Sequence, residues 1–197
     1  MIILDVETTG TEAYKHGLLS IGAVDFDEPS RRFYGECKVR NDAHIKKEAL
    51  EINGFTEIQI HDIAKQSESE LAEKFVQWAL KARDHTIAGQ NPYLDYDFVR
   101  LAAERGHIDF PVAKRTIDLH TLCYMHMVKC GLEPPIRNQR SDINSGFICR
   151  YVGIPEEGKP HIGINGALWE AEAISRILKS KNLIGEFSQF PIPWKTA

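Results

Sequence analysis

The stretch Ile2-Ile3-Leu4-Asp5-Val6-Glu7-Thr8-Thr9-Gly10 begins with an apolar run that predicts a buried β-strand and ends with two acids and a turn. Residues two apart in a strand face the same side, so Asp5 and Glu7 present their carboxylates together at the strand end. Two neighbouring carboxylates repel each other unless a cation lies between them, which favours an oxygen-rich Mg²⁺ or Mn²⁺ site. Two solvated acids at a strand terminus are the alternative.

Outward from this strand, the hydrophobic pattern predicts a mixed α/β domain. Turn-forming residues at 27–30 separate two more strand-like runs, and helical periodicity follows from residue 68 onward. The predicted strands cover residues 2–6, 18–26, 32–39 and 86–89, and the predicted helices cover residues 68–82, 92–105, 119–129, 143–152 and 167–180. Strands come first and alternation with helices follows, so we expect one mixed sheet flanked by helices. Residues 1–180 form the predicted domain, and residues 181–197 form an extended C-terminal tail of the same domain.

Two later acids stand near the starts of predicted helices. Pro92 at the first helical position puts Asp95 in the first turn, where the helix dipole favours a carboxylate that can reach the sheet end. Asn165 is the predicted N-cap of the last helix, Glu170 lies in its first turn near the apolar face, and Glu172 points to solvent. Taken singly, each of these acids is explained as an ordinary helix acid.

Composition and charge narrow the class of protein. The 197 residues, of which 43% are hydrophobic and 26% charged, suit one soluble globular domain. No apolar run approaches the roughly 20 residues that a membrane span requires. The first strand has no leader ahead of it, so we expect a cytoplasmic protein. A net charge of −4 argues against a protein that coats long nucleic acid, but not against an enzyme that holds a few nucleotides.

Cysteines and basic residues give weaker signals. The four cysteines, at positions 37, 123, 130 and 149, lie far apart without a CxxC pair, so we expect reduced thiols and neither a zinc site nor a disulfide framework. Basic residues cluster at 46–47, 114–115 and 137–140, where they either guide a nucleic-acid strand or form ordinary solvated surface.

Three separated motifs share one family resemblance. They read Asp-x-Glu-Thr-Thr-Gly at residues 5–10, Asn-x-x-x-Asp-x-x-Phe at 91–98 and Asn-Gly-Ala-Leu-Trp-Glu-Ala-Glu-Ala at 165–173. In this order they resemble the motifs of the DEDD exonuclease superfamily, which includes ribonuclease T and the proofreading subunit of DNA polymerase III. Residues 18–24 and 49–56 resemble further segments of that family. The resemblance extends from residue 1 to about residue 180 and implies a ribonuclease-H-like α/β fold.

The resemblance also implies roles for individual residues. The matched metal-binding acids are Asp5, Glu7, Asp95 and Glu170, the last at a position where the family usually has aspartate. The family mechanism uses two Mg²⁺ or Mn²⁺ ions, one at the attacking water and one at the leaving 3′ oxygen. The expected substrate contacts are Thr8, Thr9, Gly10 and Asn91.

The position of the general base departs from the family pattern. In the His-containing branch the base lies five residues before the fourth acid, and here that position holds Asn165, whose amide can orient water but cannot take its proton. Three explanations are open: an introduced His-to-Asn substitution, a natural enzyme that relies on metal-bound hydroxide, or a base supplied by His161 from the loop at 160–163. A loop histidine beside proline and glycine is most often simply exposed.

The sequence therefore predicts a metal-dependent 3′-to-5′ exonuclease that acts on the free 3′ end of single-stranded DNA or short RNA. The alternative is an inactive nucleic-acid-binding module of the same fold, although four retained acids that repel phosphate without metal argue against it. Many family members are homodimers, and the predicted helix at 119–127 is a candidate interface or an ordinary part of the core. The motifs leave DNA versus RNA preference and the biological pathway undecided.

Overall fold

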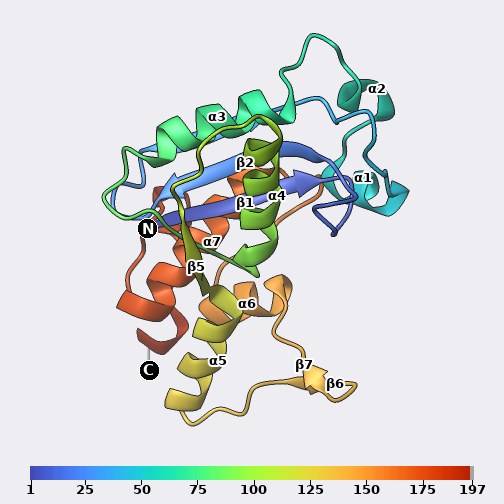
Figure 1. Cartoon of the computed structure of the whole chain (residues 1–197). Helices are drawn as coiled ribbons and strands as arrows, with labels where there is room; N and C mark the ends of the chain where they lie inside the picture. The colour runs from blue at the N-terminus through green and yellow to red at the C-terminus, as the bar shows by residue number, and fades with distance from the viewer. Residues whose placement is uncertain (196–197) are drawn as a thin grey trace.

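A mixed five-stranded sheet forms the centre of the chain in the computed structural model, which describes residues 1–195 (Figure 1). The strands are β1 (Ile2–Thr8), β2 (Leu18–Asp25), β3 (Arg32–Glu36), β4 (Thr86–Gly89) and β5 (Ala113–Asp118). Their order is β3-β2-β1-β4-β5, with β2 antiparallel to its neighbours β1 and β3, and with β4 and β5 parallel to β1. The carboxyl ends of β1, β4 and β5 therefore lie at one edge of the molecule.

Helices cover both faces of this sheet. They are α1 (Lys47–Asn53), α2 (Glu57–Ile60), α3 (Glu68–Ala79), α4 (Pro92–Arg105), α5 (Leu119–Lys129), α6 (Ser145–Val152) and α7 (Gly163–Lys179). The core around α3 and α4 takes Ile2, Leu4 and Val6 from β1, whereas Ile3 packs with α5, α6 and α7. Because strand residues alternate, the two acids of β1 face the same side as Ile3, toward α7.

The mixed α/β class and most of the predicted elements are confirmed. Helices α4 and α5 have the predicted bounds, and the four predicted strands form within a few residues of their expected limits. The prediction missed β5, the short helices α1 and α2, and a small hairpin of β6 (Ile136–Arg137) and β7 (Arg140–Ser141). All four cysteines are free, as expected. Within the part of the chain that the structure describes, no helix is long and apolar enough to cross a membrane.

The predicted start of α7 was wrong. The helix begins at Gly163 with Ile162 as its N-cap, so Asn165 lies inside the first turn instead of capping it. A Cβ atom at Gly22 would overlap the backbone of Gly163, so the helix start rests directly on β2. This close backbone contact sets where the helix begins and overrides the capping preference of Asn165.

The C-terminal tail and Glu172 also differ from expectation. The described part of the tail contains two 3₁₀ helices, η1 (Gly185–Phe187) and η2 (Pro193–Lys195), and is not simply extended; residues 196–197 of the predicted tail lie outside the described residues. Glu172 is fully buried, not solvated, because it pairs with Arg176 at 2.6 Å and accepts hydrogen bonds from two backbone amides of the tail. The acid therefore joins α7 to the tail.

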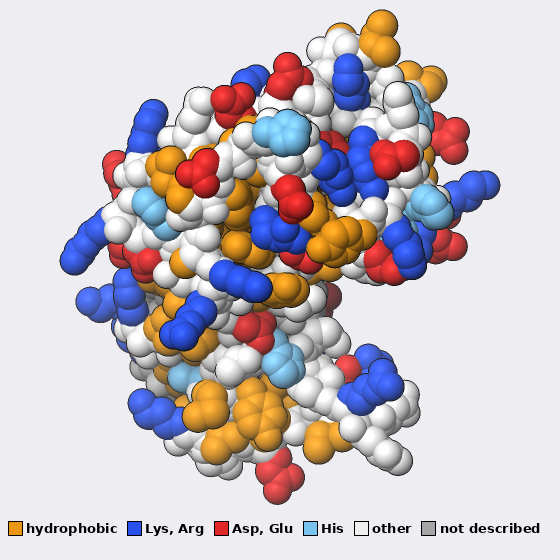
Figure 2. Space-filling model, in the orientation of Figure 1, with side chains coloured by type: hydrophobic (Ala, Val, Ile, Leu, Met, Phe, Trp, Pro, Cys, Tyr) orange, Lys and Arg blue, Asp and Glu red, His pale blue; other side chains and the backbone are white. Residues whose placement is uncertain are grey.

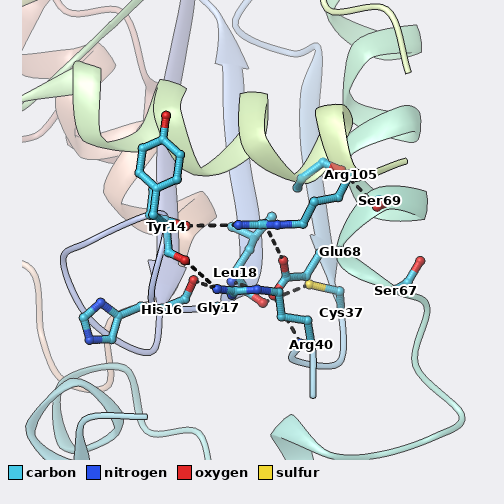
Figure 3. Close-up of polar contacts among 12 residues, drawn as sticks. Tyr14, His16, Gly17, Leu18, Cys37, Arg40, Ser67, Glu68, Ser69 and Arg105 are labelled. Atoms are coloured by element: carbon cyan, nitrogen blue, oxygen red, sulfur yellow. Dashed lines mark hydrogen bonds and ion pairs between the residues drawn. The ribbon is translucent and has the colours of Figure 1, made fainter. Parts of the chain in front are cut away.

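A polar cluster holds the loop that follows β1 (Figure 3). Glu68, at the start of α3, is buried and accepts hydrogen bonds from the backbone amides of Leu18 and Arg40 while pairing with Arg105 at 3.2 Å. Arg40 in turn donates to the carbonyls of Tyr14 and His16. These contacts tie α3 and α4 to the segment between β1 and β2, and so fix the path of the chain just beyond the two acids of β1.

Candidate active site

Asp5 and Glu7 lie at the carboxyl end of β1, on the face covered by α7. Glu7 is buried and Asp5 is partly buried. The first turn of α7 can approach them because Gly166 has no side chain: a Cβ atom there would overlap Oδ2 of Asp5. The strand alternation predicted from the sequence thus places both carboxylates against one helix.

Asp95 reaches the same strand end from α4. It lies in the first turn of that helix, as predicted, and its Oδ1 accepts a hydrogen bond of 3.0 Å from the backbone amide of Val6. Phe98 and Val99 on the following turn are buried in the core, which fixes the helix against the sheet. The hydrogen bond to β1 therefore fixes the Asp95 carboxylate beside the segment that carries the other two acids.

Glu170 brings the fourth carboxylate from α7. Its Oε1 accepts a hydrogen bond of 3.0 Å from the backbone amide of Gln90, just after β4. Its Oε2 is buried and has no hydrogen-bond partner. Gly89 leaves room for this carboxylate, since a Cβ atom there would lie 2.6 Å from Oε2. A buried carboxylate oxygen without a donor costs free energy unless a cation or a ligand satisfies it.

All four acids have raised pKa values. Burial first, and then the negative charges of neighbouring acids, raise the pKa of Asp5 and of Glu170 well above their usual range. The same causes raise the pKa of Glu7 to about 8, and burial raises that of Asp95 to about 7. The neighbouring charges that act most strongly on Asp5 are all negative, and they include Glu157. Neutralising this cluster requires protons or a cation.

Three of the four acids, Asp5, Glu7 and Glu170, line a cleft of about 330 Å³ at the end of β1, whereas Asp95 lies behind its lining. Figure 2 shows the molecule hollowed between the body that holds the sheet and the arm that carries the β6–β7 hairpin. The cleft is lined by Asp5, Val6, Glu7, Gln90, Ser145, Gly146, Cys149, Glu156, Glu157, His161, Gly166, Trp169 and Glu170. The lining comes from β1, the end of β4, α6, α7 and the loop between these two helices, so segments far apart in sequence form it together.

The two candidates for the general base lie in different surroundings. Asn165 is exposed on the first turn of α7 and does not line the cleft, whereas His161 does. The backbone amide of His161 donates to the carbonyl of Ile52 in α1, and its Nδ1 lies 3.8 Å from Oε2 of Glu157. The histidine is thus held from two sides at the mouth of the cleft, beside a carboxylate that can orient its ring.

The predicted substrate contacts are not brought together as expected. Thr9 is fully buried, and its hydroxyl donates to the carbonyl of His44 and accepts from the amide of Gly17, so it is not accessible to a ribose. The Thr8 hydroxyl donates to the carbonyl of Gly10. Gly10 is buried as well, and Asn91 is exposed beside the cleft without lining it. Only Thr8 and Asn91 of the four therefore keep part of their side chain accessible.

Sequence reasoning missed Gln90 and Asp118. Gln90 lines the cleft, and its Oε1 is buried without a hydrogen-bond partner. Asp118 ends β5, caps α5 and accepts from the amide of Asn91 at 3.1 Å. Both directly follow or end a parallel strand, where ligand-binding residues gather in open α/β sheets. Recognition of β5 would have pointed to Asp118, whereas Gln90 carries no signal beyond its place before Asn91.

The donor set suits a hard divalent cation. Carboxylate and amide oxygens are the ligands that Mg²⁺ and Mn²⁺ prefer, and Glu170 and Gln90 each hold a buried oxygen without a donor. Among residues 1–195, no three His, Cys, Asp or Glu side chains already converge as a formed metal-binding group. The match between this site and Mg²⁺ or Mn²⁺ therefore rests on the chemical type, the burial and the mutual repulsion of the acids.

Comparison with known proteins gives one family match. The model of a family described as exonuclease, RNase T, matches residues 2–167. No curated protein matches the chain.

Solved structures share the fold at low sequence identity. Exonuclease I from E. coli in complex with a dT13 oligonucleotide is 17% identical with a TM-score of 0.69, over 89% of this chain and 40% of that one. Cell-death related nuclease 4 is 17% identical with a TM-score of 0.69, over 100% and 70%. The nuclease domain of 3′hExo, described as a DEDDh family member bound to rAMP, is 15% identical with a TM-score of 0.68, over 93% of each chain. The chain spans about two fifths of the exonuclease I length.

Proposed function

The chain belongs to the RNase T family of exonucleases, and from this premise we propose that it is a divalent-metal-dependent 3′-to-5′ exonuclease of single-stranded DNA or short RNA. One observation carries the proposal. Four carboxylates from three elements spread over 165 residues lie near the carboxyl end of β1, largely buried, and each has a raised pKa. A fold stabilised by packing alone gains nothing from such mutual repulsion.

Divalent ions would be held by Asp5, Glu7, Asp95 and Glu170. When bound, they supply Lewis acidity for the attacking water and for the leaving 3′ oxygen. The protein's own residues set the geometry: Val6 orients the Asp95 carboxylate through its amide, and Gln90 orients that of Glu170.

His161 is the base in this proposal, and Asn165 is not. The His161 ring lines the cleft, whereas the Asn165 amide lies outside the cleft. The Nδ1 side of the ring faces Glu157, which leaves Nε2 to take the proton of the attacking water. Water attacks phosphorus, the bond to the 3′ oxygen of the penultimate nucleotide breaks, and that oxygen leaves as a hydroxyl after taking up a proton. The product is a nucleoside 5′-monophosphate.

Nuclease assays on single substitutions test these roles. The purified chain is incubated with Mn²⁺ and 5′-labelled single-stranded DNA or RNA, next to Asp5→Ala, His161→Asn and Asn165→Ala variants. We expect stepwise shortening from the 3′ end by the parent chain and none by Asp5→Ala. His161→Asn should lose about 10² to 10⁴ in kcat, as expected for a missing general base, while Asn165→Ala stays within a few fold of the parent.

Three outcomes would contradict parts of the proposal. Shortening from the 5′ end, or internal cuts, would overturn the 3′-to-5′ assignment. Binding of Mn²⁺ without release of mononucleotides by any form would instead favour an inactive nucleic-acid-binding module. A large loss in Asn165→Ala with none in His161→Asn would return the base position to residue 165.

A homodimer through α5 is a separate expectation. The helix buries Cys123 and Met127 in the core and leaves Tyr124, Met125 and Val128 exposed on the other side. The exposed side offers an apolar contact surface, and light scattering of the purified chain with a Met125→Glu control measures whether it is used.

A further inference from the structure

The β6–β7 hairpin places two arginines directly opposite each other. Arg137 on β6 and Arg140 on β7 are paired residues, joined by a two-residue turn of Asn138 and Gln139. Directly opposed residues project from the same face of a hairpin, and like charges in that position are destabilising. Arg137 is offset by Asp142 at 2.7 Å, while the structure gives the Arg140 guanidinium no ion-pair partner among the described residues.

The hairpin is locally unfavourable in its backbone as well. Asn138 and Gln139 have φ values of 50° and 60°, the left-handed region that a tight hairpin turn requires and that glycine usually supplies. Asparagine tolerates this conformation, but for glutamine it costs about 1 kcal/mol. Ile136 of β6 is 75% exposed, so burial of its side chain does not offset these unfavourable contributions. A two-stranded hairpin of this kind is marginally stable by itself.

The rest of the structure nevertheless fixes the hairpin beside the cleft. Ser141 of β7 contacts Nε2 of His120 at 2.8 Å, and His120 follows Asp118, the cap of α5 that also accepts from Asn91. In the other direction the chain passes within three residues into α6, where Ser145 and Gly146 line the cleft. Figure 2 shows basic side chains on the arm that projects beyond the hollow.

We infer that the β6–β7 hairpin is a backbone clamp, on which Arg137 and Arg140 bind phosphates of the single strand upstream of its 3′ end. A phosphodiester chain supplies the anion that Arg140 lacks and a second acceptor for Arg137, and arginine binds phosphate in a bidentate manner. The inference rests on the proposed function for its substrate class. It adds a contact remote from the carboxylates that serves affinity for long strands and leaves bond cleavage to the cleft.

The test compares paired charge removals. Arg137→Gln/Arg140→Gln, Arg137→Lys/Arg140→Lys and, as a matched control on β5, Lys114→Gln/Arg115→Gln are made in the full chain. Fluorescence anisotropy in EDTA measures affinity for labelled DNA and RNA strands of about 20 nucleotides between about 50 and 200 mM salt. Hydrolysis of the p-nitrophenyl ester of thymidine 5′-monophosphate with Mn²⁺ measures the cleft alone, because this substrate is too short to reach the hairpin.

The glutamine pair on the hairpin should bind roughly tenfold more weakly at low salt, with a salt slope smaller by about 1.4, which corresponds to two lost phosphate contacts on a single strand. The lysine pair should keep most of the slope, and the β5 control should match the parent. Ester hydrolysis should stay unchanged in all variants.

If the double glutamine variant of the hairpin keeps the parent's affinity for the labelled strands and the parent's salt slope, the clamp is overturned, whatever the rate of hydrolysis. Absence of ester and strand hydrolysis in the parent, together with the expected binding loss, would instead contradict the proposed function and leave the clamp standing.

Discussion

Glu157 stands beside His161 and adds a fifth negative charge to the cleft. It raises the pKa values of Asp5 and Glu7, and burial raises its own, while the nearby His161 opposes that rise. A carboxylate at Nδ1 fixes the tautomer and the plane of an imidazole, as in many metal and protease sites. Glu157, whose Oε2 lies 3.8 Å from Nδ1, is therefore the group that we expect to position the proposed base.

Replacing Glu157 by glutamine should lower kcat about tenfold with KM for the oligonucleotide unchanged, because the ring loses its orientation while substrate contacts persist. Rates are measured at saturating Mn²⁺, so that a weaker metal affinity does not mimic the effect. Glu156→Gln is the control: Glu156 lines the same cleft but pairs with Arg150. Equal losses in both variants would show that only the summed charge matters.

Individual residues differ in how far the sequence predicts them. Spacing alone placed Asp5 and Glu7 on one side of a strand and Asp95 in a first helical turn, because both patterns are local. Which residues line the cleft depends instead on contacts between segments that are far apart in the sequence. His161 reaches it through its bond to Ile52 in α1, a helix that the sequence pattern did not reveal, and Gln90 reaches it through the end of β4.

Helix α7 joins the site to the C-terminal tail. Two and six residues beyond Glu170, the buried pair of Glu172 and Arg176 contacts the tail, and the Arg176 guanidinium donates to carbonyls of residues 152, 187 and 190. These bonds satisfy groups that would otherwise be buried without partners. Helix α7 is thus held at its C-terminal half by the tail. Its start is held by the close contacts of Gly163 and Gly166 with β1 and β2.

Arg176→Met should lower the free energy of unfolding by about 3–5 kcal/mol, since it leaves Glu172 charged and unpaired in the interior. The melting temperature should fall by roughly 10 °C in thermal scans followed by circular dichroism. Arg150→Met, at an exposed position of α6, is the matched control and should change the melting temperature little. The double variant Glu172→Leu/Arg176→Met should recover much of the loss, and a double variant as unstable as Arg176→Met would refute the pairing argument.

Elements with strong local patterns were predictable, and those set by contacts were not. The helix of residues 92–105 has proline at its start and a continuous apolar face, and its bounds were predicted. The start of α7 depends on Gly22 meeting Gly163, a contact between residues 141 positions apart. Strand β5 was missed because its side chains are exposed or half-buried, which removes the apolar signal.

The acid cluster makes the free energy of unfolding of the whole chain depend on pH. The folded chain holds Asp95 with a pKa of about 7 and Glu7 with a pKa of about 8, whereas unfolded carboxyls titrate near pH 4. Between about pH 5 and pH 8 the folded state therefore binds more protons than the unfolded state, and stability falls as pH rises. His126 acts in the opposite direction, because burial lowers its pKa, but it is one group against four.

Melting temperatures in EDTA should accordingly decrease from about pH 5 to about pH 8, and excess Mn²⁺ should raise them most at the upper end, where the carboxylates are free of protons. Differential scanning fluorimetry at matched ionic strength gives both curves, and their difference removes the contribution of groups that do not bind metal, His126 among them. Asp5→Asn removes one charge from the centre of the cluster, so it should flatten the EDTA curve and shrink the Mn²⁺ effect while raising stability at pH 8 without metal. A parent chain that becomes more stable in EDTA across this range, or that responds to Mn²⁺ equally at both ends of it, would mean that the four acids are compensated within the protein and are not the site of the ions.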